Sequence, residues 1–275
     1  MEVEIDFRKT PQKNAEKYFE ESKKARKKLD AAERAIKETV KKMEEVELKE
    51  QKRAEKPKKK VRGKWFNKFH WCITSDDFLV IGGRDATQNE MIFKKHVEQG
   101  DIVLHADIQG APLTVVKSEG KAVTPVALKE AGEIAAAYSS AWKHGLGSVD
   151  VYWVSPEQIS KTAEAGEFLP KGSFMIRGRK TYLRKIPLRI AVGIRIERGE
   201  ETTATVIAGG LESISKHARY FATIVPGSLE QGAAAQEVKK RLLYKAMPDD
   251  KPLIEAIELD EIRKNIPAGK SDVVS

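Results

Sequence analysis

Hydrophobic and polar positions divide the chain into a polar N-terminal part and a mixed part that starts at Trp65. Residues 14–55 contain neither Gly nor Pro, and Pro11, Asn14 and Pro57 supply start and stop signals for one long helix. Small and apolar residues recur on it at two heptad positions, Ser22, Leu29, Ile36 and Met43, then Ala25, Ala32, Thr39 and Val46. So narrow a seam predicts a coiled-coil helix that needs a partner helix.

No second heptad stretch follows in the sequence. The partner of this helix is therefore expected to be either a second copy of the chain or a segment upstream of it. The second possibility predicts that the chain is a fragment or a split gene product.

From Trp65 onward, aromatic and β-forming residues replace the lysine-rich pattern. Alternation predicts strands near 71–74, 78–82, 102–107, 113–117, 149–154, 173–177, 188–196, 203–208 and 220–225. Helices are predicted at 86–98, 125–143 and 231–246, and a hairpin around Gly199. We expect an α+β fold, a mixed sheet domain with packed helices at 65–247, preceded by a basic coiled-coil arm and hinge at 1–64 and followed by a tail at 248–275.

The charge is unevenly distributed, which adds a candidate partner. Residues 1–64 hold 22 of the 50 Lys and Arg residues but only 14 of the 41 Asp and Glu residues, so almost the whole net charge of +9 lies there. A basic arm is typical of proteins that bind a polyanion, RNA or a membrane surface, although a solvated lysine-rich helix has the same composition. Charge alone leaves these interpretations open.

The number of cysteines and the hydropathy narrow the class of protein to which the chain can belong. Cys72 is the single cysteine, which excludes an internal disulfide and a cysteine zinc cluster. No stretch approaches the ~20 apolar residues that span a membrane, and the first ten residues lack the apolar core of a secretory signal. We expect a cytoplasmic protein without a membrane partner.

The first candidate site is the stretch 79–96, in which two glycines lead from a predicted strand into Arg84 and Asp85. Asp85 could cap the following helix, or Thr87 could do so in a capping box with Glu90. The first helical turn and the Arg84 guanidinium could instead hold a phosphate. The sequence by itself favours the helix cap.

The second candidate lies on the predicted strand 102–107, where His105 and Asp107 share a face. They could form part of a metal site, an acid–base pair or a structural hydrogen-bonded pair. The other histidines show no ligand spacing, and no nucleophile elbow, dinucleotide fingerprint or P-loop is present. Spacing favours the structural pair, and an enzyme that uses Asp85, His105 and Asp107 with a metal or small molecule is the alternative hypothesis.

The third candidate is the basic run at 173–189. It contains Arg177, Arg179, Lys180, Arg184, Lys185 and Arg189, with Tyr182 among them. Aromatic and cationic side chains together suit RNA, whose bases stack and whose phosphates bind guanidinium groups. A solvated β-hairpin would have the same pattern.

Several long segments, taken in order, resemble one family. They include "NAEKYFEESKKARKK", "KWFNKFHWCITSDDFLVIGGRDATQNE", "DIVLHADIQGAP" and "SFMIRGRKTYL". Together they resemble the C-terminal half of the NFACT family, the NEMF-like and RqcH-like ribosome quality-control factors formerly labelled fibronectin-binding-like. The resemblance implies an RNA-binding R domain after the second strand of a coiled-coil arm, without the family's N-terminal domain and helix-hairpin-helix region.

The resemblance also implies a function. Family members bind the large ribosomal subunit with a stalled peptidyl-tRNA and recruit tRNA for C-terminal tailing without mRNA. The partners implied are large-subunit rRNA and tRNA, together with the missing N-terminal region or a second copy of the chain. No cofactor and no enzymatic activity of the chain's own are implied, because the ribosome performs peptidyl transfer.

The RNA-binding residues expected from the matching motifs and the basic run are Gly83, Arg84, Asp85, Gln88, Asn89, His105, Asp107, Lys161, Arg177, Arg179, Lys180 and Arg184. Thr87 departs from the motif, where a second glutamine is expected. The residues flanking the H-A-D block also differ from the usual ones. These changes are conservative and leave the expectation unchanged.

Overall fold

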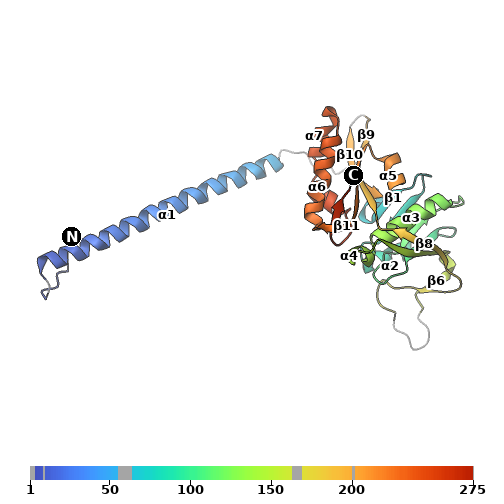
Figure 1. Ribbon diagram of the computed structural model, residues 1–275, viewed down its shortest axis with the longest axis horizontal. Coiled ribbons are helices and arrows are strands. Elements are labelled where there is room, and N and C mark those ends of the chain that lie inside the picture. Colours follow the sequence, from blue (N-terminus) through green and yellow to red (C-terminus); the bar gives the residue numbers. More distant parts are fainter. Residues whose placement is uncertain (1–3, 9, 55–63, 163–168, 200–201, 275) are drawn as a thin grey trace. The chain divides into compact units, whose positions relative to one another are not determined.

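The computed structural model describes residues 4–8, 10–54, 64–162, 169–199 and 202–274, without the side chains of 41–54. The chain forms two compact units, Met1–Arg62 and Gly63–Ser275 (Figure 1). No helix in the described ranges is long and apolar enough to cross a membrane. Helices and antiparallel sheets together confirm the α+β class.

The first unit is dominated by one helix, α1 (Pro11–Ala54), which begins at the predicted proline. The Asn14 amide donates to the carbonyl oxygens of Asp6 and Thr10, at 3.0 and 3.3 Å, and so closes the segment before the helix onto its first turn. On the heptad seam, Leu29 and Ile36 are 59% and 62% exposed. The described part of the seam thus keeps its apolar face uncovered, and a partner helix stays a prediction.

The second unit begins with a short 3-10 helix, η1 (Trp65–Lys68), and holds a six-stranded antiparallel sheet in the order β1-β2-β4-β3-β5-β8. Its strands are β1 (His70–Ile73), β2 (Leu79–Gly82), β3 (Ile102–Ala106), β4 (Thr114–Lys117), β5 (Ser148–Val154) and β8 (Thr181–Pro187). Successive residues face opposite sides, so Val103 and Val115 join one hydrophobic cluster, whereas Leu104 and Val116 join another. Both faces of the central strands are therefore buried.

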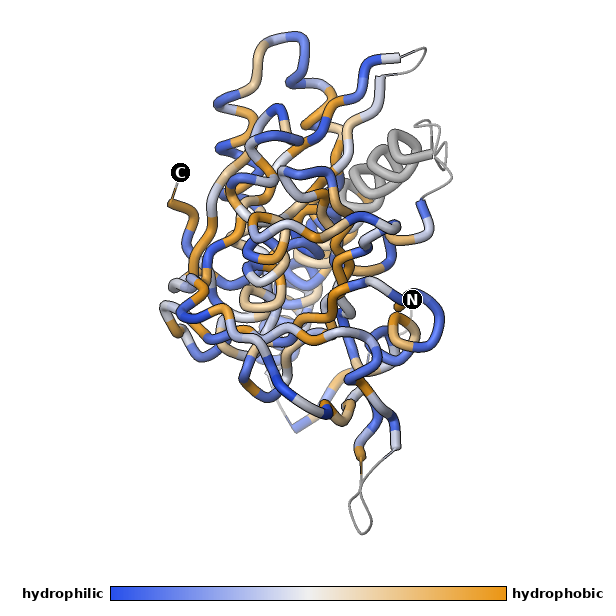
Figure 2. Tube along the Cα trace, turned by 90° about the vertical axis from the view of Figure 1, so that its right-hand side faces the viewer, coloured by the Kyte–Doolittle hydropathy of each residue, from blue (hydrophilic) through white to orange (hydrophobic). Residues whose placement is uncertain are grey.

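Each face of this sheet packs against a helix. The helix α3 (Pro125–Ala137) lies beside β8 in Figure 1, and its Gly132 permits this approach, because a Cβ atom there would lie 3.1 Å from a methyl carbon of Leu183. On the opposite face, α2 (Ala86–Lys95) contributes the fully buried Ile92. In Figure 2 the hydrophobic stretches gather towards the middle of this unit, and the hydrophilic ones are common in its outer turns.

A second sheet of four strands has the order β10-β9-β11-β12. It contains β9 (Ile190–Glu197), β10 (Thr203–Gly209), β11 (Tyr220–Leu229) and β12 (Ser271–Val273), with α5 (Leu211–His217) and α6 (Gln231–Lys245) packed beside it. The predicted hairpin is confirmed, since Glu197 pairs with Thr203, although residues 200–201 lie outside the described residues. One core cluster combines residues of both sheets with α3.

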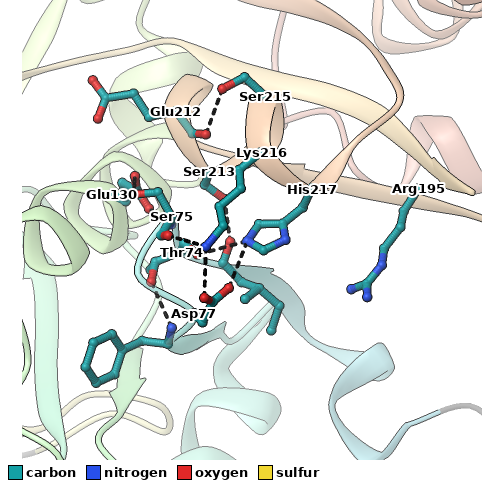
Figure 3. A network of polar contacts seen from close by, with 12 residues as sticks. Thr74, Ser75, Asp77, Glu130, Arg195, Glu212, Ser213, Ser215, Lys216 and His217 are labelled. Atoms are coloured by element: carbon teal, nitrogen blue, oxygen red, sulfur yellow. Dashed lines mark hydrogen bonds and ion pairs between the residues drawn. The ribbon is translucent and has the colours of Figure 1, made fainter. Parts of the chain in front are cut away.

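A polar network joins the two sheets at the turn between β1 and β2 (Figure 3). The Lys216 ammonium on α5 donates to the Ser75 carbonyl oxygen at 2.6 Å and to the Asp77 carboxylate at 2.8 Å. On α3, the buried Glu130 carboxylate accepts from the Ser75 backbone N–H at 2.7 Å and from its hydroxyl at 2.6 Å. This turn is consequently held by α5, which packs beside the second sheet, and by α3, which packs on the first sheet.

The prediction of a separate tail at 248–275 is wrong. This segment forms η3 (Pro248–Asp250), α7 (Lys251–Glu255), α8 (Leu259–Arg263) and β12, and its isoleucines enter the main core. Asp250 is 1% exposed and binds Arg198, Arg219 and Tyr220. Two helices of five residues each are too short to show a helical period, so the sequence pattern does not reveal them.

Two other elements differ from the prediction. The helix predicted at 125–143 is two helices, α3 and α4 (Ser140–Lys143), because the Ser139 hydroxyl donates to the Ala136 carbonyl oxygen and accepts from the Ala141 N–H.

Strand β8 was not predicted, since its charged outer residues hide the apolar alternation. The small strands β6 (Ile159–Ser160) and β7 (Met175–Ile176) form a separate pair.

A buried carboxyl group on α3 gives a prediction on stability. Burial raises the pKa of Glu133 from 4.5 to about 7. Between these pH values the native state keeps a proton that the unfolded chain has lost, so the free energy of unfolding falls as pH rises, by about 3 kcal/mol in total. We expect Glu133→Gln to remove this loss, as measured by urea unfolding at pH 5 and pH 8.

The exposed Glu255 on α7 supplies the control for this measurement. The Glu255→Gln variant is expected to keep the pH dependence of the parent. If the free energies of unfolding of the parent and of Glu133→Gln differ by the same amount at pH 5 and pH 8, the raised pKa of Glu133 is contradicted.

Candidate nucleic-acid interface

The turn between β2 and α2 is built around a helix cap. Asp85 has extended backbone angles and its carboxylate accepts the Gln88 N–H at 2.8 Å, so Asp85 rather than Thr87 is the N-cap. The Asn89 side-chain oxygen accepts the Leu113 N–H at 3.1 Å, which ties α2 to the start of β4. Gly83 is required sterically, because a Cβ atom there would lie 2.0 Å from that same oxygen.

Arg84 and Gln88 bond to the backbone of their own domain. The Arg84 guanidinium donates to the carbonyl oxygens of Lys264 at 2.7 Å and Phe69 at 3.0 Å. The Gln88 side chain accepts the Arg84 N–H at 3.0 Å and donates to the Lys68 carbonyl oxygen at 3.2 Å. These bonds connect the turn to η1 and to the end of α8, and RNA contact by the two side chains stays a prediction.

Lys161 also has partners within the domain. Its ammonium lies 2.8 Å from a Glu90 carboxylate oxygen, 2.9 Å from the Ser173 carbonyl oxygen and 4.4 Å from the centre of the Phe174 ring. The Lys161 ammonium, the Gly172 N–H and Lys94 together lower the pKa of Glu90 to about 2. The charge of Lys161 thus fastens the segment 171–174 to the first turns of α2.

Three rings stand side by side across β3, β5 and β8. His105 pairs with Tyr152, and Tyr152 pairs with Tyr182, so the three side chains lie on one face of the sheet. The ring centres are 5.8 Å apart for the first pair and 5.9 Å for the second. We call His105, Tyr152 and Tyr182 the ring row.

Two cations lie on the ring row. The Lys180 ammonium is 4.2 Å from the centre of the Tyr152 ring, and the Arg184 guanidinium is 4.1 Å from that of Tyr182. Arg184 is also held by the Asp150 carboxylate at 2.6 Å. The Lys185 N–H and the Arg184 guanidinium lower the pKa of Asp150. The distances fit cation–π contacts. Tyr152 is 7% exposed, so the half-buried Tyr182 and His105 supply the accessible aromatic surface of the row.

Arg177 and Arg179 are exposed in the segment that leads into β8 and its Tyr182. Their backbone is fixed, because the Gln158 side-chain amide donates to both carbonyl oxygens, at 2.9 and 3.0 Å, and the Gln158 carbonyl oxygen accepts the Arg177 N–H. Gly178 between them has a φ of +77°. Within the described residues neither guanidinium has a hydrogen-bond or ion-pair partner, so both are available to an anion.

A cleft of about 480 Å³ opens beside the ring row. It lies between the turn at 83–86, the loop 109–113 and the segment 171–176, and Tyr152 forms part of its wall. His105 lines it, its Nδ1 atom is shielded from solvent and has no hydrogen-bond partner in the described structure, and burial lowers the pKa of its imidazole. Asn89 lines the same cleft.

The predicted strand that holds both His105 and Asp107 ends earlier than expected, but the two residues stay close to each other. Strand β3 ends at Ala106, and Asp107 lies in the loop beyond it, where its N–H donates to the Asp150 carbonyl oxygen and its carboxylate accepts the hydroxyl of Tyr182 in the ring row at 3.5 Å. Asp85 is used as a helix cap, and the described residues contain no group of three or more acidic, His or Cys side chains that could hold a metal. The geometry therefore gives no support to an enzyme that uses these three residues.

The structure thus brings the predicted site residues into two groups. Gly83, Arg84, Asp85 and Asn89 line the cleft, and Gln88 and Lys161 hold the segments around it. His105 belongs to the ring row, and Asp107, Lys180 and Arg184 contact its tyrosines. Tyr152 was missed by sequence reasoning. Its alternation with the neighbouring valines shows that it lies on a strand, but only the pairing of β5 with β3 places it beside His105.

Comparison with known proteins identifies a domain. Residues 68–178 match the profile of the NFACT protein RNA-binding domain. The chain is 40% identical over 219 residues to the archaeal Rqc2 homolog aRqcH of Methanocaldococcus jannaschii, covering 79% of this chain and 31% of that protein. It is 43% identical over 175 residues to the human ribosome quality control complex subunit NEMF, covering 62% of this chain and 16% of that protein. The chain thus spans less than a third of either relative.

Among solved structures, the C-terminal part of a fibronectin/fibrinogen-binding protein from Streptococcus suis superposes with a TM-score of 0.38. The sequences are 20% identical, and the match covers 64% of this chain and 76% of the other. A similarity of this size supports no argument about fold or function.

The steric role of Gly83 can be tested with alanine. A Cβ atom at Gly83 meets the Asn89 side-chain oxygen at 2.0 Å and its backbone nitrogen at 2.8 Å, so Gly83→Ala should lower the free energy of unfolding by about 1–3 kcal/mol. Gly147→Ala is the matched control, because no atom lies within 4 Å of a Cβ there. Urea unfolding measures both, and equal stability of the two variants would contradict the packing described.

Proposed function

Because this chain carries an NFACT-type RNA-binding domain and is related in sequence to ribosome quality control proteins, we propose that it binds RNA on the ribosome through the ring row and the arginines beside it. The partner is the large ribosomal subunit that still carries a stalled peptidyl-tRNA. There the chain helps to recruit tRNA for C-terminal tailing without mRNA. The chain itself performs no catalysis, and it acts in the cytoplasm.

The ring row is the observation that carries this proposal. Single-stranded RNA is recognised by stacking of its bases on aromatic rings and by cations that bind its phosphates. The row provides rings in register on adjacent strands, with Lys180 and Arg184 on two of them. Rigid strands hold these groups in place, so little ordering is required when RNA binds.

The distribution of charge supports a located contact. Residues 65–275 are nearly neutral overall, so Arg177 and Arg179 form a local positive site on a balanced surface. The basic residues of α1 give a second, sequence-independent attraction to RNA. Its exposed apolar seam is the place for a partner helix, from the N-terminal region of a longer protein or from a second copy of the chain.

The arginine pair gives the first test of the proposal. We expect Arg177→Glu combined with Arg179→Glu to weaken binding to tRNA and to large subunits by at least about 10-fold at low salt. The slope of log K against log[salt] should fall by roughly 2, since two phosphate contacts are lost. Filter binding at several salt concentrations measures both quantities.

The matched control reverses the same charge elsewhere. Lys240 on α6 and Lys251 on α7 are exposed, so Lys240→Glu combined with Lys251→Glu changes the net charge equally. This variant should retain most of the affinity and the salt slope of the parent. Equal weakening in both double variants would contradict a located site and indicate general attraction.

Stacking can be tested separately at Tyr182. Tyr182→Ala removes the ring beneath Arg184 and should weaken binding of single-stranded RNA by about 5- to 150-fold, the loss expected for one stacked base. Tyr182→Phe keeps the ring and should bind nearly as the parent does. The same affinity for the Ala and Phe variants would show that the ring does not stack on RNA.

A further inference from the structure

We propose that the cleft beside the ring row receives a single unstacked nucleobase of the bound RNA. This inference rests on the proposed function and gives the cleft a ligand class, an uncharged heteroaromatic ring. The cleft adjoins the row through Tyr152, which belongs to both. A strand of RNA stacked along the row could therefore turn one base into the cleft.

The walls of the cleft suit a flat apolar ring. Tyr138, Tyr152 and Phe174 present aromatic surface, and Val103, which lies on the same face of the sheet as Tyr152, forms an apolar part of the lining. Tyr138 is fixed by stacking on His70, at 3.6 Å between ring centres, and by a bond from its hydroxyl to the Asn265 carbonyl oxygen at 2.8 Å. The walls are thus preformed, as is usual for small-ligand sites.

The polar groups of the cleft call for a hydrogen-bonding edge. The imidazole of His105 lines the cleft, and its Nδ1 atom is shielded from solvent without a hydrogen-bond partner in the described structure. A base edge offers both donors and acceptors, so it can pair with the other ring nitrogen, Nε2, in either neutral tautomer. Burial lowers the pKa of His105, and the ring therefore enters this contact uncharged at neutral pH.

The cleft lining carries charges of both signs. The Asp85 carboxylate is part of the lining, and the Arg84 guanidinium there already donates to two backbone carbonyl oxygens. Lys171 also lines the cleft and has no hydrogen-bond or ion-pair partner in the described structure, and the exposed Arg177 and Arg179 lie outside it. The proposal therefore places the base against the aromatic walls and its phosphate on Lys171 or on the two arginines.

A nucleotide and its base-free counterpart distinguish a base in the cleft from a phosphate there. The full chain is titrated with AMP and, separately, with ribose 5-phosphate, while the side-chain nitrogen signals of His105 are followed by NMR. AMP should shift the side-chain nitrogen resonances of His105 in a saturable manner, and ribose 5-phosphate should not. Equal shifts with both compounds, or no shift with AMP, would overturn the proposal.

Two substitutions at Ser173 test the location. Ser173 lines the cleft, and its hydroxyl has no hydrogen-bond partner in the described structure, so Ser173→Trp fills the space while Ser173→Ala leaves it open. The Trp variant should lose at least about 10-fold in AMP affinity, the cost of one displaced stacking contact, and the Ala variant should match the parent. If the Trp variant is unfolded by circular dichroism, the comparison of AMP with ribose 5-phosphate on the parent decides alone.

The outcome also separates this inference from the proposed function. If the chain binds tRNA but AMP leaves His105 unchanged, the cleft is not a base site and the proposed RNA binding stands. If the chain binds neither tRNA nor large subunits at low salt, the proposed function fails, and the inference about the cleft fails with it.

Discussion

The pairing of β5 with β3 on one side and β8 on the other is the constraint on which the candidate site depends. This antiparallel register places His105, Tyr152 and Tyr182 abreast, whereas a shift of one residue would turn Tyr152 to the opposite face. The opposite face is occupied by α3, and Gly132 permits its close approach to β8. The core packing therefore sets which side chains the sheet presents.

The basic side chains of the domain serve two different purposes. Arg84 and Lys161 are bound to carbonyl and carboxylate oxygens of their own domain and hold loops in place. Arg177 and Arg179 are exposed, with only their backbone fixed. The internal cations thus shape a rigid surface, and the external ones give it the charge that a polyanion requires. This division explains how a motif rich in arginine can be partly structural.

Local signals in the sequence were sufficient for much of the fold, because most strands, the long helix and the Asp85 cap depend on neighbouring residues. The role of Arg84 could not be predicted, since its partner Lys264 is 180 residues away. The C-terminal segment was misread because its helices are too short to show a period. Likewise, the ring row depends on strand order, and no single segment of the sequence contains that information.

The central claim is that RNA lies along the ring row and the arginines beside it. Photocrosslinking of the full chain to tRNA that carries 4-thiouridine, followed by mass spectrometry of the peptides, tests it most directly. The account predicts crosslinks within residues 174–184 and at Tyr152 or His105. Crosslinks confined to α6, α7 and the second sheet, with none on β3, β5 or β8, would contradict it.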